Sequence, residues 1–438
     1  AGLFSLTGLA AAEHAGPAVT ISFVVAALGC AFAGLCYAEF ASMIPVAGSA
    51  YTYAYATMGE FMAWIIGWDL ILEYALGAAT VGVSWSQYLN KFLEHYGIYI
   101  PDHLTRGPFE AVDPGMINLP AVIIVALISL VLMRGTKESA FLNNILVVVK
   151  VVVVLLFIIL GWQYMNPDFH IPFIPEHVPA HIDPVTSEKV PAFGGWSGIA
   201  AGAAMVFFAF IGFDAVSTAA QEAKNPQKGM PIGIIGSLII CTILYVLFSY
   251  VMTGLVPFSD FKNNASPAAT AFAATPYTFL QQGLIVAILA GYTSVIMVML
   301  LGQSRVFYSM STDGLLPKFF SDLHPKFKTP WKTNLFFMFF IAIFAGFVPV
   351  VDLGHMVSIG TLLAFALVCL GVLILRKKMP DAPRAFKVPL VPLIPILGIV
   401  MCVYLMISLP LASWIRLVIW MGLGVLIYFM YSKSRSKL

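Results

Sequence analysis

The sequence is built from apolar runs of about 20 residues that are separated by short polar segments. A helix of about this length is needed to cross the hydrocarbon core of a bilayer. Only 10% of the residues are charged, whereas soluble domains carry about 25%, so this chain cannot cover itself with a polar, water-exposed surface. The runs therefore predict an all-α integral membrane protein.

Twelve membrane-spanning helices are predicted, of which the first is incomplete. They cover residues 1–13, 18–43, 61–92, 117–133, 141–164, 198–222, 231–256, 281–311, 333–350, 355–375, 391–411 and 413–431. The chain begins without methionine, inside an apolar run and without a positively charged leader. We therefore expect residues upstream of position 1 and no signal peptide.

Lysine and arginine are distributed unequally between the two sides of the predicted bundle. Most of the 23 Lys and Arg residues fall in the loops of one side and in the C-terminal tail. Positively charged loops are retained on the cytoplasmic side. This distribution predicts that both termini are cytoplasmic and that the long loop over residues 165–197 is external.

Two of the predicted spans are interrupted by glycine. The sixth contains "FFAFIGFDAVSTAA", with Gly212 and Asp214 near mid-depth, and the first contains "AGLFSLTG", with Gly2 and Gly8. Irregular backbone inside a membrane is tolerated where it lines a cavity or is covered by protein. The interruptions lie five spans apart, as in inverted repeats, although glycine also serves close helix packing, and the pattern leaves both explanations open.

The third span carries a polar stripe. Residues at spacings of three or four share one face of a helix, and here they are Asp69, Glu73, Gly77, Thr80, Ser84 and Gln87. Two carboxylates on consecutive turns exceed what helix packing requires. The stripe favours a face that meets a solvated pathway, with polar packing against another helix as the alternative.

Lys150 lies in the middle of the apolar run "NNILVVVKVVVVLLFII". A charged side chain near the bilayer centre costs at least about 2.5–3.5 kcal/mol, and such residues usually have a function. A static ion pair that braces the bundle is the alternative interpretation.

Four long stretches carry a resemblance to a known family. They are "AGLFSLTGLAAAEHAGPA", "CYAEFASMIPVAGSAYTYAYATMGEFMAWIIGWDLILEYALG", "FFAFIGFDAVSTAAQEAKNPQKGMPIGI" and "GQSRVFYSMSTDGLLPKFFSDLHPKFKTP". The chain resembles the amino acid–polyamine–organocation superfamily, most closely bacterial homologues of cationic amino acid transporters. The resemblance implies a five-plus-five inverted-repeat (LeuT-like) fold with discontinuous helices 1 and 6. The repeats would cover residues 1–164 and 198–375, and residues 376–438 would form helices 11 and 12 and a cytoplasmic tail.

The sequence departs from the family pattern at two points. The first helix lacks its cytoplasmic half and the leading glycine of the family's G-[ST]-G turn, with Ala1 at the middle position. The motif after the eighth span reads "STDGLLP", where the family more often has a basic residue before Asp-Gly.

The resemblance implies a binding site for an L-amino acid between the two interrupted helices. A helix that starts at mid-membrane presents free N–H groups and a positive dipole end to a carboxylate, and a helix that ends there presents carbonyls to an ammonium. The implied site residues are Ala1, Gly2 and Leu3 from the first span and Phe208, Ala209 and Ile211 from the sixth. The Phe208 ring would be the lid over the substrate. The side-chain pocket would involve Glu73, Ser294, Met297 and Met299.

The ionisable groups in and near the spans are given separate roles. Asp214 is expected to cap the inner half of the sixth span by accepting N–H bonds from residues two or three onward. Glu39 and Glu222 are expected to be gate or loop-anchoring groups. By the resemblance, Lys150 takes the place of a bound cation and bonds to carbonyls of the broken first helix, with Glu73 as a proton relay or a contact for a basic substrate.

The sequence therefore predicts a proton-coupled amino acid symporter of the cell membrane that works by alternating access. Neutral L-amino acids are expected substrates and cationic ones are left open, and an obligate exchanger of amino acids or amines is the alternative function. The chain contains no HExxH or GxSxG motif, so an enzyme is disfavoured. Protons and membrane lipids are the other expected partners. No cofactor, metal, nucleic-acid or protein partner is expected, and the five cysteines are interpreted as small buried apolar residues.

Overall fold

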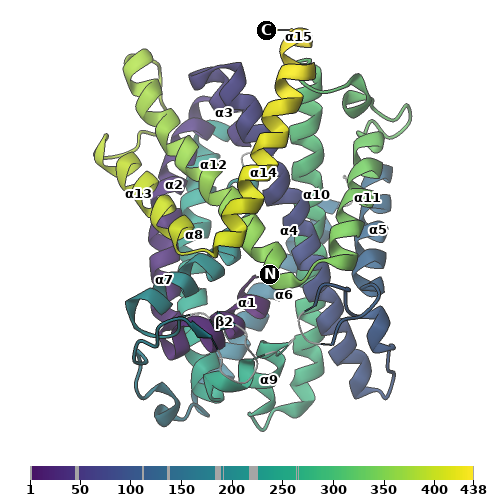
Figure 1. Ribbon diagram of the computed structural model, residues 1–438, viewed down its shortest axis with the longest axis vertical. Coiled ribbons are helices and arrows are strands. Elements are labelled where there is room, and N and C mark those ends of the chain that lie inside the picture. The colour runs from purple at the N-terminus through teal and green to yellow at the C-terminus, as the bar shows by residue number, and fades with distance from the viewer. Residues whose placement is uncertain are drawn as a thin grey trace.

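The computed structural model describes residues 2–44, 49–110, 113–135, 139–182, 189–190, 192–216, 225–262, 264 and 266–437. These residues form a bundle of long helices (Figure 1). The helices are α1 (Gly2–Ala10), α2 (Val19–Met43), α3 (Ser49–Met58), α4 (Glu60–His95), α5 (Leu119–Arg134), α6 (Ser139–Trp162), α7 (Gly195–Val206), α8 (Pro226–Leu255), α9 (Pro267–Ala273), α10 (Thr278–Thr312), α11 (Trp331–Phe347), α12 (Val350–Lys378), α13 (Leu393–Ile407), α14 (Leu411–Ile427) and α15 (Lys433–Arg435). The strands β1 (His181–Ile182) and β2 (Lys189–Val190) form an antiparallel pair in the loop before α7.

The helices coincide with the predicted apolar runs. Among the described residues, seven helical stretches are long and apolar enough to cross a membrane, and four shorter apolar helices accompany them. The long stretches are Gly2–Met43, Glu60–His95, Asn144–Trp162, Pro226–Leu255, Phe279–Thr312, Val350–Lys378 and Leu411–Arg435. The short ones are Leu119–Arg134, Gly195–Phe210, Trp331–Phe347 and Leu393–Ile407. The chain is a multi-pass helical membrane protein.

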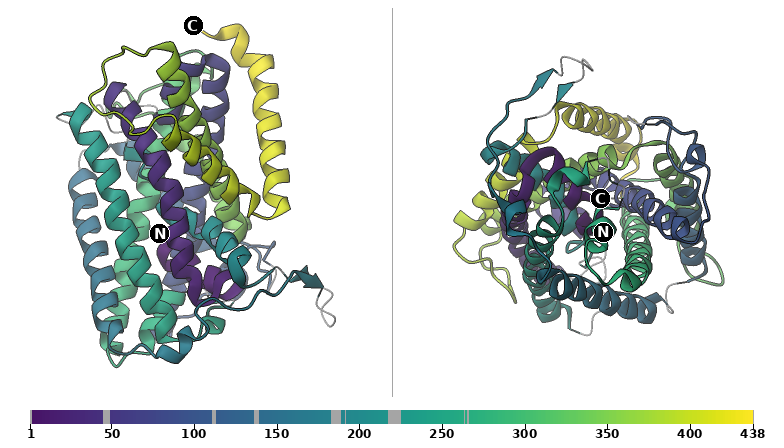
Figure 2. Two further views of the ribbon diagram at one scale, coloured as in Figure 1. Left: turned by 90° about the vertical axis from the view of Figure 1, so that its left-hand side faces the viewer. Right: turned by 90° about the horizontal axis from the view of Figure 1, so that it is seen from below.

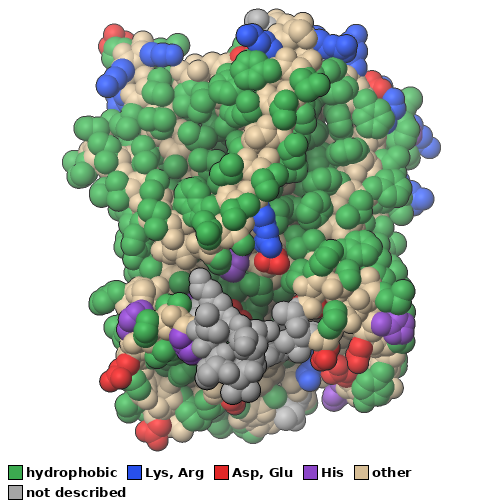
Figure 3. Space-filling model, in the orientation of Figure 1, with side chains coloured by type: hydrophobic (Ala, Val, Ile, Leu, Met, Phe, Trp, Pro, Cys, Tyr) green, Lys and Arg blue, Asp and Glu red, His purple; other side chains and the backbone are tan. Residues whose placement is uncertain are grey.

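The surface is organised as expected for a protein in a bilayer. On the face shown in Figure 3, apolar side chains cover the middle of the molecule, and Lys and Arg gather at the end where the C-terminus lies. Acidic and histidine side chains are found mainly toward the opposite end. Helix α4 is mostly buried and packs against α10 and α12, so it forms the interior on which the functional groups are arranged.

The sixth span is broken, as predicted. Helix α7 passes into a tight turn at Phe207–Phe210. Ile211 is then extended (ψ 134°) and Gly212 has a φ of +121°, a conformation that suits glycine because it has no Cβ. The helical path of the sixth span therefore ends inside the bundle.

The first span is not broken at Gly8. Helix α1 is continuous over Gly2–Ala10 and begins at mid-height of the molecule (Figure 2). Gly8 lies within it, and a Cβ at this position would come within 2.4 Å of the Pro267 Cβ. Of the two explanations left open for this glycine, the structure supports close packing, because Gly8 allows α1 to approach α9.

Glu39 anchors the loop between α12 and α13. Its fully buried carboxylate accepts two bonds from Arg376, at 2.9 and 2.7 Å, and one from Arg384 Nε at 3.1 Å. The Val388 N–H donates a further bond at 2.7 Å. Removing one partner of a buried pair is strongly destabilising, so these bonds fix the loop at the end of the bundle that carries the C-terminus. Glu222, which was given a similar role, lies outside the described residues.

We predict that Gly8→Ala lowers the thermal stability of the purified protein. The added methyl group meets Pro267, and such overpacking costs about 1–3 kcal/mol. Gly283→Ala in α10 is the control, because nothing lies within 4 Å of its Cβ position. Melting measurements in detergent that give equal stability for the two variants would contradict the assigned packing.

Candidate functional site

The beginning of α1 meets the break in the sixth span. A Cβ at Gly2 would lie 2.8 Å from the Ala209 Cα and N atoms and 2.9 Å from Phe208 Cδ1. Leu3, Phe208 and Ala209 are all buried. The structure thus brings Gly2, Phe208 and Ala209, which were assigned to one site from the sequence, into direct contact. Ala1 lies outside the described residues.

The carbonyl groups at the break already have protein partners. Tyr245 of α8 donates its hydroxyl to the Ala209 carbonyl at 3.0 Å, and the Ile211 N–H donates to the Phe208 carbonyl at 3.3 Å. A carbonyl has two lone pairs, so each of these oxygens can still accept a bond from an ammonium group. Tyr245 was not identified from the sequence, because nothing there distinguishes it from a lipid-facing aromatic residue.

Lys150 reaches from α6 to α10. Its ammonium donates to Ser294 Oγ at 2.9 Å. A Cβ at Gly291 would lie 2.8 Å from Lys150 Cδ, so this glycine makes room for the lysine stem. Cys241 of α8 is also within electrostatic range.

Two expectations about Lys150 differ from the structure. In the described part of the chain, its hydrogen bond goes to Ser294 and not to carbonyls of the first helix, because α10 supplies a hydroxyl within reach. Ser294, which was expected to line the side-chain pocket, accepts this bond from the lysine.

The same turn of α10 also contacts α1. Tyr292 Oη and Ser5 Oγ lie 2.5 Å apart. Tyr88 of α4 donates to the Phe4 carbonyl at 2.7 Å, and its ring meets that of Tyr292 edge-on, with centroids 5.6 Å apart. These contacts were missed at the sequence level, although Tyr88 directly follows Gln87 of the predicted polar stripe.

Two neighbouring residues of α4, Glu73 and Tyr74, lie next to Asp214. Tyr74 donates to Asp214 Oδ2 at 2.6 Å. Glu73 is fully buried and has Asp214, Asp69 and Thr361 as polar neighbours. Glu73 therefore belongs to the group around Asp214 and not to the Lys150–Ser294 pair.

Asp214 bonds to the backbone at more than one residue, and one of these bonds runs in an unexpected direction. Asp214 Oδ1 accepts the N–H of Gly212, two residues earlier in the chain, at 3.2 Å. The prediction placed the accepted bonds two or three residues onward. Residues 217–224, the greater part of the helix half to be capped, lie outside the described residues.

Two methionines of α10 are buried in the interior, and one of them lies against α4. Met299 Sδ lies 3.6 Å from the Cβ position of Gly77 in α4. Met297 is 8% exposed and Met299 is 3% exposed. Methionine is a flexible apolar filler, so this part of the interior can adapt to apolar groups of different shape.

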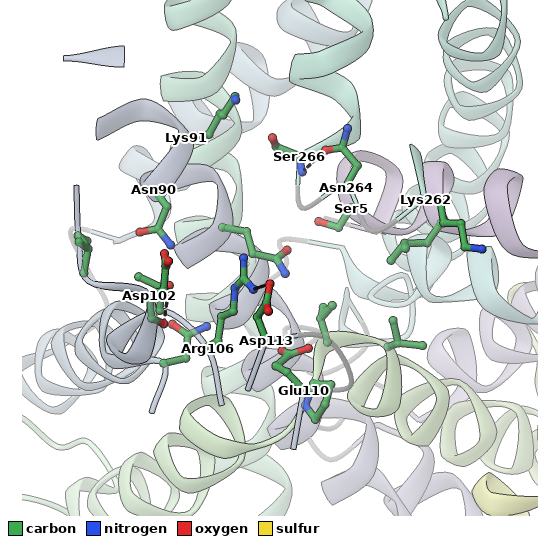
Figure 4. Close-up of a pocket in the computed structure, with 18 of the residues that line it drawn as sticks. Ser5, Asn90, Lys91, Asp102, Arg106, Glu110, Asp113, Lys262, Asn264 and Ser266 are labelled. Carbon is green, nitrogen blue, oxygen red and sulfur yellow. Dashed lines mark hydrogen bonds and ion pairs between the residues drawn. The ribbon is translucent and has the colours of Figure 1, made fainter. Parts of the chain in front are cut away.

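A polar cavity of about 1180 Å³ leads toward α1 from the end opposite the C-terminus (Figure 4). Its inner end is formed by Ser5 and Leu9. Ten charged side chains line it, namely Glu13, Lys91, Glu94, Asp102, Arg106, Glu110, Asp113, Asp260, Lys262 and Asp352. Arg106 pairs with Asp113 at 3.1 Å. Burial raises the pKa of Glu110, Arg106 opposes this change and Asp352 adds to it.

The polar stripe of α4 lines this cavity only in part. Gln87, with Asn90 beyond it, faces the cavity. Thr80 and Ser84 instead donate to carbonyls of their own helix, at 2.8 and 3.0 Å. The predicted solvated face is thus confined to the outer end of α4.

Helix ends that meet inside a membrane bundle, below a polar cavity, are the arrangement with which transporters hold small solutes. The class of protein is therefore a multi-pass membrane transporter.

Comparison with known proteins identifies the family. Residues 1–431 match the amino acid permease family model, and the chain belongs to this family of the amino acid–polyamine–organocation superfamily. It is 47% identical, over its whole length and 90% of the relative, to the branched-chain amino acid permease BcaP of Bacillus subtilis. It is 42% identical, with the same coverage, to the methylthioribose transporter of that organism. The vacuolar cationic amino acid transporter 4 of Arabidopsis thaliana is 36% identical over 87% of the chain and 61% of the relative. The protein is thus an amino acid transporter and not an enzyme.

We predict that Gly2→Ala abolishes substrate binding but not folding. The methyl group would force α1 away from Ala209 and Phe208, and each 1.4 kcal/mol of lost binding energy lowers affinity about tenfold. Gly354→Ala is the control, because its Cβ would meet Leu6 at an ordinary contact distance of 3.5 Å. Binding of radiolabelled substrate to purified protein tests this prediction, and unchanged affinity in Gly2→Ala would contradict the site.

Proposed function

We propose that this transporter is a proton-coupled symporter of neutral, aliphatic L-amino acids that works by alternating access. The observation that carries the proposal is the environment of Lys150. Its ammonium lies within a membrane-spanning helix and is bonded to the neutral hydroxyl of Ser294. Among the described residues no carboxylate pairs with it, so its proton can leave and return without breaking an ion pair. The alternative of a static brace requires such a pair.

The choice of neutral substrates rests on three observations. Two relatives, at 47% and 36% identity, are branched-chain amino acid permeases. Met297 and Met299 supply apolar, adaptable surface. Glu73, the residue that would favour a cationic side chain, is turned toward Asp214 and does not line the cavity.

The orientation and the repeat architecture belong to the same proposal. The end rich in Lys and Arg carries the C-terminus (Figure 3), and the positive-inside rule favours the cytoplasm for that end. The cavity would then face outward, and the loop held by Glu39 would lie on the inner side. A helix at every predicted span and the break at Phe207–Phe210 support twelve spans and two inverted repeats of five.

We predict that Lys150→Met loses concentrative uptake. With one proton per substrate, a gradient of one pH unit sustains about tenfold accumulation, and the variant should reach only equal concentrations in proteoliposomes. Exchange of internal for external substrate should persist, because it needs no change of protonation. Lys433→Met, at the exposed C-terminal end, is the control for loss of positive charge.

Two results would contradict this assignment. Uphill accumulation by Lys150→Met would remove the lysine from the coupling mechanism. A wild-type protein that exchanges substrate but does not respond to an imposed pH gradient would be an obligate exchanger.

We predict that leucine, isoleucine and valine raise the melting temperature of the purified protein, whereas arginine and lysine do not. A ligand at 100 times its dissociation constant stabilises the folded state by about 2.7 kcal/mol. Methylthioribose belongs in the same screen, because one relative is named for it. A shift with arginine that disappears in Glu73→Gln would instead establish a cationic substrate and a contact between Glu73 and its side chain.

A further inference from the structure

One turn of α10 contacts both Lys150 and the first helix. Ser294 bonds to the lysine at 2.9 Å, and Tyr292, two residues earlier, bonds to Ser5 of α1 at 2.5 Å. Each residue of an α-helix is rotated by about 100° from the one before. Gly291 and Ser294 therefore share the face toward Lys150, and Tyr292 points to the other side. A movement of this turn changes both contacts at once.

The contact with α1 is reinforced from α4. Tyr88 donates to the carbonyl of Phe4, the neighbour of Ser5, at 2.7 Å. Phe4 also packs edge-on against Tyr292, with ring centroids 6.4 Å apart. Two tyrosine hydroxyls from two helices thus fasten α1 at consecutive residues.

These bonds lie where the cavity ends. Ser5 is the first residue of α1 that the cavity reaches, and Gly2 and Leu3 lie beyond it and are buried. We call Phe4, Ser5, Tyr88 and Tyr292 the cavity floor. It separates the cavity from the candidate substrate site.

We propose that Tyr292 is a positioning residue through which the charge on Lys150 controls the cavity floor. The inference rests on the proton coupling proposed above. A hydrogen bond from an ammonium is stronger than one from a neutral amine, so a protonated Lys150 holds Ser294 and keeps Tyr292 against Ser5. When the proton passes to water, the turn of α10 is released and the floor opens toward the cavity.

This sequence of events suits a symporter. The unprotonated protein is open to the cavity and accepts a proton and a substrate from the same side. Protonation then shifts the equilibrium toward the closed floor above the loaded site, although the floor can still close without it. Proton and substrate are therefore enclosed together.

The test measures access through the floor separately from transport. A cysteine is introduced at Leu3, and its reaction with a small, membrane-impermeant thiol reagent is followed against pH in proteoliposomes. Protein without the added cysteine gives the background of its five native cysteines, of which Cys30, Cys36, Cys369 and Cys402 are buried and Cys241 is partly exposed. Each rate is divided by that of a free thiol at the same pH, because only the thiolate reacts. We expect this normalised rate to be lower at low pH, where Lys150 is charged.

Two variants distinguish the bond of Tyr292 to Ser5 from the bond of Tyr88 to Phe4. Tyr292→Phe keeps the ring but removes the bond to Ser5, so labelling should become about 3- to 10-fold faster, the effect of one hydrogen bond, and lose its pH dependence. Tyr88→Phe should also speed labelling but keep the pH dependence, because it loses only the bond from α4 to the Phe4 carbonyl, and its ring can still pack against Tyr292. Tyr404→Phe, on the exposed face of α13, is the control and should match the wild type.

Transport supplies the second readout. Tyr292→Phe should retain substrate exchange and lose most of the accumulation driven by a pH gradient. Equal losses of exchange and accumulation, or labelling that matches the wild type, would overturn the role of Tyr292. If Lys150→Met abolishes accumulation but Tyr292→Phe behaves as wild type, only this inference fails. If Lys150→Met still accumulates substrate, the proposed coupling fails as well.

Discussion

The close contact between the start of α1 and the turn at Phe207–Phe210 is the constraint on which the rest of the interior depends. Backbone groups at a helix end must find partners when they lie at membrane depth. At the break a tyrosine hydroxyl supplies such a partner, since Tyr245 bonds to the Ala209 carbonyl, and Tyr88 adds a bond to the Phe4 carbonyl within α1. A tyrosine can do this from an apolar surface, because its ring packs while its hydroxyl bonds. The geometry of the candidate site is therefore set by α4 and α8 as much as by the two broken helices.

Glu39 and Lys150 are ionic groups within the bundle that differ in how their charge is compensated. Glu39 accepts bonds from two arginines and from a backbone N–H, so its charge is fully compensated and its position is fixed. Lys150 has one neutral partner among the described residues. Changing the charge of Glu39 would break a network, whereas changing that of Lys150 alters a single bond. The first arrangement suits an anchor and the second suits a group that titrates during a cycle.

The apolar runs were sufficient to locate the spans, because a bilayer imposes one length on every helix that crosses it. The break near Gly212 was expected from the family resemblance, whereas the glycine pattern alone left close helix packing as an equal explanation. Gly8 carried the same sequence signal and proved to be a packing position against Pro267. The role of Gly8 depends on where α9 packs, and the sequence of α1 alone does not predict this. The tyrosines were missed for a related reason: their roles depend on which face of a helix meets another helix end.

The arrangement around α10 also bears on how far a protonation signal must travel. Coupling between distant sites requires an element with two arrangements that both sites bias. Here the lysine and the first helix contact one helical turn, on different sides of it, so no chain of intermediate residues is needed. Gly291 leaves space for the lysine stem at this turn, which lets the side chain lie against the backbone of α10. A bulkier residue there would separate α6 from α10, and the bond to Ser294 could not form. The short path therefore depends on a glycine as much as on the residues that form hydrogen bonds.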